Sequence, residues 1–220
     1  IFFKMKKIKS LMNLSVKFFL LQVSSLVTYS LSNFLILHYL AASDVTNYNV
    51  SYKYFSVILI LNNIICMPLW SAFTEAYVKK DFIWIRNIIK KMLIVFVFWI
   101  LVGGIMLIGS NTIYGLWTGM ELNIPYSLSA VVYLFMLTCC WNGIFIAFIN
   151  GIGKIQLQVL LSILPILLML PLSKLLISVF HFGVTGIVLC MLLFNIISSL
   201  MISIQVWKIL RGTDRGIWAK

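Results

Sequence analysis

Three lysines of this sequence, Lys17, Lys53 and Lys174, lie within long apolar segments. An ionisable group at membrane depth is costly and usually faces a cavity or a partner. In a cavity of low dielectric constant, an ammonium group attracts an anion strongly. A lysine near the end of a membrane span can instead extend its charge to the interface. Both interpretations stay open here, and they stay evenly balanced for Lys174.

Neutral polar side chains add a stripe to each of the first two apolar segments. They recur at helical spacing in the first segment (Gln22, Ser25, Tyr29, Ser32, Asn33) and in the second (Ser56, Asn63, Ser71, Thr74, beside Lys53). Two such stripes predict a shared polar cavity. The alternative is contact between the helices, because small and hydroxylated residues also join membrane spans.

Patterns typical of catalytic and metal sites are missing from the sequence. It contains no Walker loop, no nucleophile elbow and no zinc-protease motif. The four cysteines lie inside apolar runs, without the spacing of a metal site, so we interpret them as packing residues. Among the five acidic residues, no two form a plausible catalytic pair on one side of a membrane. We therefore expect a protein that is not an enzyme and that needs no metal or other cofactor.

The elements that must position these side chains are membrane spans. The chain of 220 residues is 62% hydrophobic and 10% charged, whereas soluble domains carry about 25% charged residues. About 20 apolar residues are needed for a helix to cross a bilayer. The sequence predicts an all-α membrane protein with six transmembrane helices, at residues 16–40, 50–74, 92–112, 126–149, 156–180 and 184–207. The span at 92–112 is almost entirely apolar and is expected to face lipid.

Basic residues are distributed unevenly between the two sides that these spans define. Of the 17 lysines and arginines, 14 fall at the chain ends and in the 79–91 and 150–154 connections, and the three others lie within spans. The opposite connections have none, so both ends of the chain are expected on the cytoplasmic side. The net charge of +12 then reflects this bias and attraction to anionic membrane lipids, and we expect no nucleic acid partner. Because residue 1 is isoleucine, we expect the chain to continue upstream.

The stretch 68–91 joins the second and third spans. With Asp81 as N-cap, residues 81–91 place apolar and aromatic side chains on one side and basic ones on the other. That pattern predicts an amphipathic helix lying in the membrane interface, and a solvated helix on a soluble domain is the weaker alternative. Pro68, Trp70 and Trp84 are expected to have structural or interfacial roles. So is Glu75, which is spaced to pair with Lys79 one turn on.

Prolines and one tight turn shape the remaining spans. Pro165 and Pro171 should bend the fifth span as Pro68 bends the second, because each proline removes a backbone donor. Bent helices fit a protein that opens alternately to the two sides, and they fit a static bundle almost equally well. The short turn at 150–154 predicts that the fourth and fifth spans form an antiparallel hairpin.

Two runs of residues resemble a known family. Residues 45–55 (VTNYNVSYKYF) and 68–77 (PLWSAFTEAY), followed by Lys80, Asp81 and Trp84, are similar to the second half of bacterial polysaccharide flippases. These are the O-antigen (Wzx-type) members of the multidrug/oligosaccharidyl-lipid/polysaccharide exporter superfamily. The resemblance covers nearly the whole chain. It implies one bundle of a twelve-helix, two-bundle transporter, and the missing N-terminal six-helix half would be its partner.

The resemblance also implies a function. Such a protein moves oligosaccharide repeat units linked to undecaprenyl pyrophosphate across the bacterial cytoplasmic membrane, for O-antigen, capsule or exopolysaccharide synthesis, beside the polymerase machinery. Lys53, then Lys174 and Lys17, would bind the pyrophosphate, and Gln22, Asn33 and Asn63 would bind the sugars. A multidrug or cation exporter of the same fold is one alternative. A membrane enzyme such as an O-antigen polymerase is the other.

Overall fold

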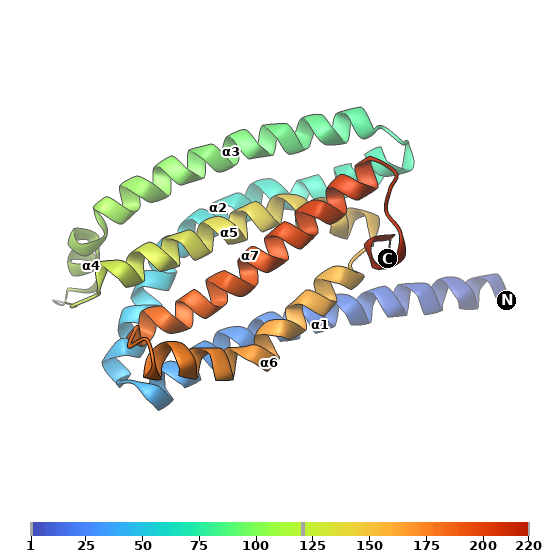
Figure 1. Ribbon diagram of the computed structural model, residues 1–220. Coiled ribbons are helices and arrows are strands. Elements are labelled where there is room, and N and C mark those ends of the chain that lie inside the picture. The colour runs from blue at the N-terminus through green and yellow to red at the C-terminus, as the bar shows by residue number, and fades with distance from the viewer. Residues whose placement is uncertain (1, 120–121, 220) are drawn as a thin grey trace.

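The computed structural model describes residues 2–119 and 122–219, and this part of the chain is helical throughout, without a strand (Figure 1). Its elements are α1 (Phe2–Tyr39), α2 (Ala42–Val78), α3 (Phe82–Ile108), α4 (Ser110–Thr118), α5 (Tyr126–Ile152), α6 (Gln156–Ser178), α7 (Gly183–Leu210) and the short 3₁₀ helix η1 (Gly216–Ala219). Six of the described helices, all but α4 and η1, are long and apolar enough to cross a membrane. The predicted all-α fold with six membrane-spanning helices is confirmed.

The long helices run roughly side by side, with α5 at the centre of the bundle. α5 packs against α2, α3 and α7, and α6 packs against α7 and α1. Figure 1 shows both chain ends, the α2–α3 connection and the α5–α6 connection at one end of the bundle. The α1–α2 and α6–α7 connections and α4 lie at the other end. The connections that are rich in lysine and arginine therefore share one end of the molecule.

Helix α2 is longer than the predicted second span of 50–74, since it begins at Ala42 and continues through Pro68 to Val78. Its first turn is stabilised by Asp44, whose carboxylate accepts a hydrogen bond from the backbone N–H of Ala41 (3.2 Å). The other spans begin or end within a few residues of their predicted bounds, except that α1 begins at Phe2 and α3 at Phe82.

The structure corrects the prediction of a separate interfacial helix at 81–91, because these residues form the first turns of α3 without a break. The predicted N-cap is confirmed: the Asp81 carboxylate accepts a hydrogen bond from the backbone N–H of Trp84 (2.9 Å). Ile85 and Ile89 on the apolar side are buried in an apolar cluster with residues of α2 and α5. That side of the helix therefore packs on the bundle at Ile85 and Ile89, and Ile83 stays exposed.

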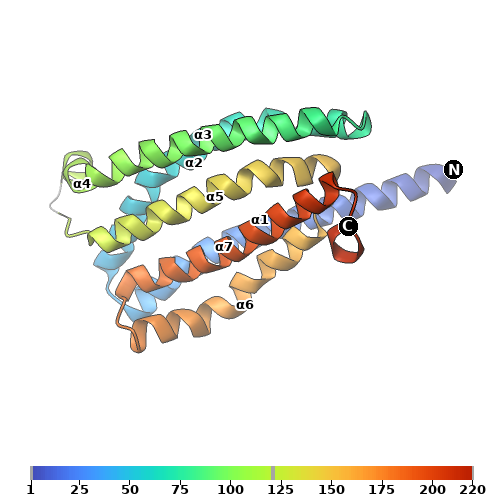
Figure 2. The ribbon, with the colours of Figure 1, turned by 45° about the horizontal axis from the view of Figure 1, so that its top comes forward.

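The predicted hairpin of the fourth and fifth spans is also wrong. Gly153, at φ 72°, ends α5 in the left-handed conformation and reverses the chain tightly. Beyond this turn α7 lies between α5 and α6, as Figure 2 shows, and α6 packs on α7 and α1 instead. α6 contains Pro165 and Pro171 and changes direction along its length (Figure 2).

The connection between α3 and α5 contains the short helix α4 and is helical as far as Thr118. The α4 side chain that anchors it is Tyr114, which is buried and whose hydroxyl is hydrogen-bonded to Ser51 of α2 (3.2 Å) and Ser129 of α5 (3.0 Å). α4 is thereby held over the ends of α2 and α5 and contributes to the walls of the site described below.

Candidate functional site

The outer face of α2 differs from the outer faces of α3 and α6. Both of these helices expose aliphatic or aromatic side chains at mid-length, such as Phe98 and Leu167. α2 exposes apolar side chains there too, such as Ile60 and Ile64, and in addition it exposes polar ones: Lys53, Asn63 and Ser71, together with Thr74 and Glu75 near its end. A lipid-facing surface should be apolar, so these polar side chains of α2 are suited to a polar environment.

The polar stripe of α1 meets that of α2 at one point of contact. The Asn49 side chain donates a hydrogen bond to Asn33 Oδ1 and accepts one from the Tyr29 hydroxyl, both at 2.9 Å. Gln22 of α1 is exposed, whereas Ser32 is buried against α7. Tyr29, Ser32 and Asn33 of the α1 stripe therefore join helices, which was the alternative interpretation of the sequence, whereas Gln22 remains on the surface.

Lys53 lines a pocket of about 560 Å³ beside this contact. The walls come from α1, α2 and α4 and consist of Tyr29, Val45, Thr46, Asn49, Val50, Lys53, Trp117 and Thr118. The pocket combines an exposed ammonium group with amide, hydroxyl and indole groups, and the described residues of its wall include no carboxylate. Such a set can bind an anion through Lys53 and hydrogen-bond its neutral portion through the exposed hydroxyl of Thr46.

The structure does not bring the other two candidate lysines to this pocket. The Lys17 ammonium donates a hydrogen bond to Gln156 Oε1 (3.0 Å) and so joins α1 to the start of α6. Lys174 is exposed on α6, away from the wall of the Lys53 pocket. Of the three lysines, Lys53 alone contributes to that wall.

Asn62 is a polar residue that the sequence reasoning missed. It is fully buried, accepts a hydrogen bond from the Trp99 indole N–H (3.2 Å) and donates to the carbonyl of Cys140 (3.5 Å). Asn63, which the sequence favoured, is exposed. Adjacent residues on a helix point about 100° apart, so one asparagine joins α2 to α3 and α5 while the other is available to a ligand.

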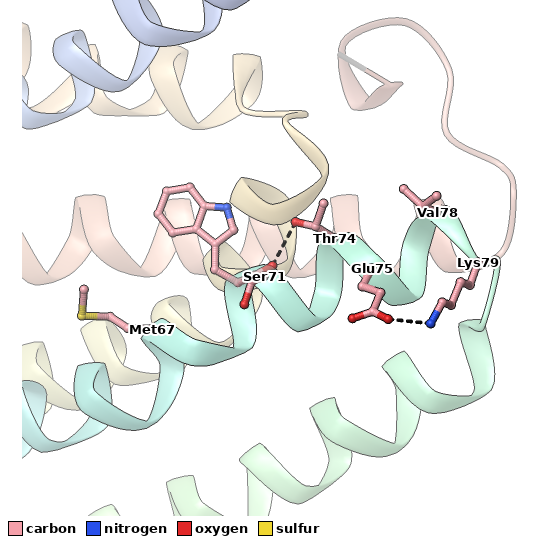
Figure 3. Close-up of a pocket in the computed structure, with 7 residues that line it drawn as sticks. Met67, Ser71, Thr74, Glu75, Val78 and Lys79 are labelled. Carbon is pink, nitrogen blue, oxygen red and sulfur yellow. Dashed lines mark hydrogen bonds and ion pairs between the residues drawn. The ribbon is translucent and has the colours of Figure 1, made fainter.

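A second groove, of about 670 Å³, follows α2 toward the basic end of the bundle (Figure 3). Glu75 and Lys79 form an ion pair along its edge (2.5 Å), which confirms the predicted pairing. The Thr74 hydroxyl lies 2.7 Å from the Gly151 carbonyl oxygen and holds α2 to α5. Trp70 packs on Phe18 of α1 with ring centroids 5.3 Å apart. Pro68 is exposed and lies in the chain between the groove residues Met67 and Trp70, and Trp84 packs on Phe73.

The basic end is held together by the C-terminal tail. The Lys154 ammonium lies 2.7 Å from the Asp214 carboxylate, and Lys208 lies over the Trp218 ring at 4.1 Å. Burial acts to lower the pKa of Lys154, but its hydrogen bond and attraction to Asp214, together with Tyr77, outweigh burial, and the pKa lies above its ordinary value. Lys220, which also belongs to the basic tail, lies outside the described residues.

Comparison with protein-family models, with characterised proteins and with solved structures finds no match for this chain. Within residues 2–119 and 122–219 the structure groups no three His, Cys, Asp or Glu side chains closely enough to hold a metal ion.

Proposed function

We propose that this chain forms one bundle of a membrane transporter, and that its exposed α1–α2 face lines the path of an anionic, lipid-linked oligosaccharide. The observation that carries the proposal is Lys53, an exposed lysine within the long apolar helix α2 that lines a pocket together with Thr46, Asn49 and Trp117. At the centre of a bilayer a lysine facing lipid costs about 2.5–3.5 kcal/mol. An aqueous path or an anionic ligand removes most of that cost.

The neutral groups beside Lys53 support the same class of substrate. Thr46 offers a hydroxyl for hydrogen bonds, and Trp117 offers a flat apolar surface. A pyrophosphate with attached sugars needs all three kinds of contact. The resemblance of residues 45–55 and 68–77 to polysaccharide flippases supports undecaprenyl pyrophosphate as the carrier, and the bacterial cytoplasmic membrane as the location, with both chain ends cytoplasmic.

A second bundle completes the path in this proposal. The exposed side of α2 carries Lys53, Asn63 and Ser71 among apolar side chains, and a facing bundle would shield these polar groups from lipid. The missing six-helix half that the resemblance implies is the proposed occupant. Proteins of polysaccharide polymerisation would then receive the translocated repeat unit.

The test replaces Lys53 in the full-length gene by alanine and by arginine, with Lys90→Ala as a control that removes an exposed lysine of α3. A charge-assisted hydrogen bond contributes about 1.5–3 kcal/mol, which corresponds to at least tenfold in binding. We expect Lys53→Ala to lower surface polysaccharide about tenfold at unchanged membrane abundance. Lys53→Arg should retain part of the activity, and Lys90→Ala should match the parent. Normal polysaccharide in Lys53→Ala would remove Lys53 from the site.

Deletion of the gene tests the reaction itself. Accumulation of complete lipid-linked repeat units facing the cytoplasm, with loss of surface polymer, is the expected result. If single repeat units still reach the surface without lengthening, the protein is a polymerase. If polysaccharide is unchanged and drug sensitivity rises, it is an exporter. Either of these two outcomes would overturn the proposal.

A further inference from the structure

A second polar cavity lies inside the bundle, and none of the residues singled out from the sequence as ligands belongs to its wall. Its volume is about 360 Å³, and it lies among α1, α2, α5, α6 and α7. The polar part of the wall includes Ser24, Thr28, Asn142, Gln158, Ser162 and Ser198. A volume of this size is sufficient for a small organic ligand.

Two carbonyl oxygens in this wall are buried without a hydrogen-bond partner. They are Oδ1 of Asn142 and Oε1 of Gln158. The Asn142 side chain is 8% exposed, and its amide nitrogen donates to Ser198 Oγ (3.3 Å). A buried acceptor without a donor is unfavourable. The same wall carries hydroxyl groups, such as that of Tyr52, and the amide nitrogen of Gln158, so the cavity offers a neutral ligand both hydrogen-bond acceptors and donors.

The chemistry of the wall limits what that ligand can be. None of the described lining residues is Lys, Arg, Asp or Glu, so a charged group would enter without a counter-charge. Hydroxyl and amide groups alternate with the aromatic rings of Tyr29, Tyr52, Phe135 and Phe194. Aromatic faces take up the apolar side of a ring, and amide and hydroxyl groups take up hydroxyls. This combination fits a neutral, ring-shaped molecule with many hydroxyl groups.

We propose that the inner cavity binds one neutral sugar residue, with Asn142 and Gln158 as acceptors of its hydroxyl protons. The position supports this assignment, because Tyr29 belongs to the walls of both the inner cavity and the Lys53 pocket. Its ring lies 5.3 Å from that of Tyr52. A sugar in the inner cavity and an anion at Lys53 would occupy neighbouring pockets. The site rests on the proposed function only for the source of the sugar, which is either the lipid-linked oligosaccharide or a free monosaccharide.

The experiment measures binding of radiolabelled N-acetylglucosamine and galactose to the purified full-length protein in lipid nanodiscs. We expect saturable binding of at least one sugar, and Asn142→Leu should raise the half-saturating concentration about tenfold. Asn150→Leu is the matched control, because Asn150 is on the same helix and also has a buried, unpaired Oδ1, but does not line the cavity. It should bind as the parent does. Gln158→Leu provides a second test from a different helix.

Absence of sugar binding to the parent protein would overturn the proposal, and so would equal effects of Asn142→Leu and Asn150→Leu. Binding of sodium that depends on Asn142, without binding of sugar, would identify a cation site and would also overturn it. N-acetylglucosamine 1-phosphate distinguishes the sources. If the sugar phosphate binds more tightly than the free sugar, and Lys53→Ala removes this difference, the natural ligand is a phosphate-linked sugar. If the two compounds bind equally, the natural ligand is a free monosaccharide. Sugar binding together with unchanged polysaccharide in the deletion strain would retain this site and reject the transport function.

Discussion

The contact between α3 and α5 depends on Gly103, and replacing it by alanine should destabilise the bundle. A Cβ atom built on Gly103 would lie 2.2 Å from Cε2 of Tyr133 and 2.9 Å from Cδ1 of Ile58. The Tyr133 ring cannot turn aside freely, because its hydroxyl donates to the Ile100 carbonyl (2.7 Å). Overpacking of this kind costs about 1–3 kcal/mol. Alanine in place of glycine in a helix returns about 1 kcal/mol, and we expect a net loss of up to about 2 kcal/mol.

The next residue along α3 provides the matched control. A Cβ on Gly104 meets no atom within 4 Å, so Gly104→Ala should change the free energy of unfolding by 0 to about +1 kcal/mol, in the stabilising direction. Unfolding of the purified protein by dodecyl sulfate in mixed micelles, followed by circular dichroism, measures both variants. Adding Tyr133→Ala to Gly103→Ala should remove the clash, so that the effects of the two changes are not additive.

Equal stability of the Gly103→Ala and Gly104→Ala proteins would refute this reasoning, because it would mean that α3 and α5 do not approach closely at Gly103. Additive effects of Gly103→Ala and Tyr133→Ala would show that the tyrosine ring is not the obstacle.

Three further predictions concern other contacts, each measured by the same unfolding assay. Asn62→Ala should lower the free energy of unfolding by about 1–3 kcal/mol, because the buried indole N–H of Trp99 loses its acceptor. Asn63→Ala should leave the free energy of unfolding unchanged and lower the amount of surface polysaccharide. The opposite result would assign the structural role to Asn63 and the ligand role to Asn62. Lys80→Gly should stabilise by about 1 kcal/mol, because Lys80 has φ 58°, and a loss of stability would contradict this. The pKa of Lys154 is raised in the folded protein, so the stability that its charge contributes is present at neutral pH. This stability is lost as the pH rises above about 10.4 and through the folded-state pKa. Asp214→Asn should make the pH-dependent loss smaller and should lower the free energy of unfolding at neutral pH by at most about 1 kcal/mol.

Several features of this protein follow from the sequence because they depend on residues close together in the chain. The six spans follow from hydropathy alone. The Asp81 cap and the Glu75–Lys79 pair each join residues three or four positions apart. The exposed polar face of α2 follows from helical periodicity in the same way. Such features are determined before any two helices meet.

The wrong predictions from the sequence concern where one helix ends and the next begins, and which helices pack against each other. The segment 81–91 has an amphipathic pattern that suits a membrane surface, and the fold uses its apolar side to cover the bundle. The short turn at Gly153 predicted a hairpin, yet α7 packs between the two helices that it joins. Lys17 resembled a cavity lysine, and its partner is Gln156, more than 130 residues away in the chain.

By itself the sequence determined an all-α membrane protein of six long apolar helices, with its basic connections at one end and a polar side on α2. Only the tertiary structure decided that Asn62 is buried and Asn63 exposed, that Lys53 has a pocket, and that Asn142 and Gln158 face one cavity. The physical reason is that hydropathy and periodicity describe one helix at a time. A pocket is formed by the rotations of several helices relative to one another, and these rotations are set by contacts between residues far apart in the chain.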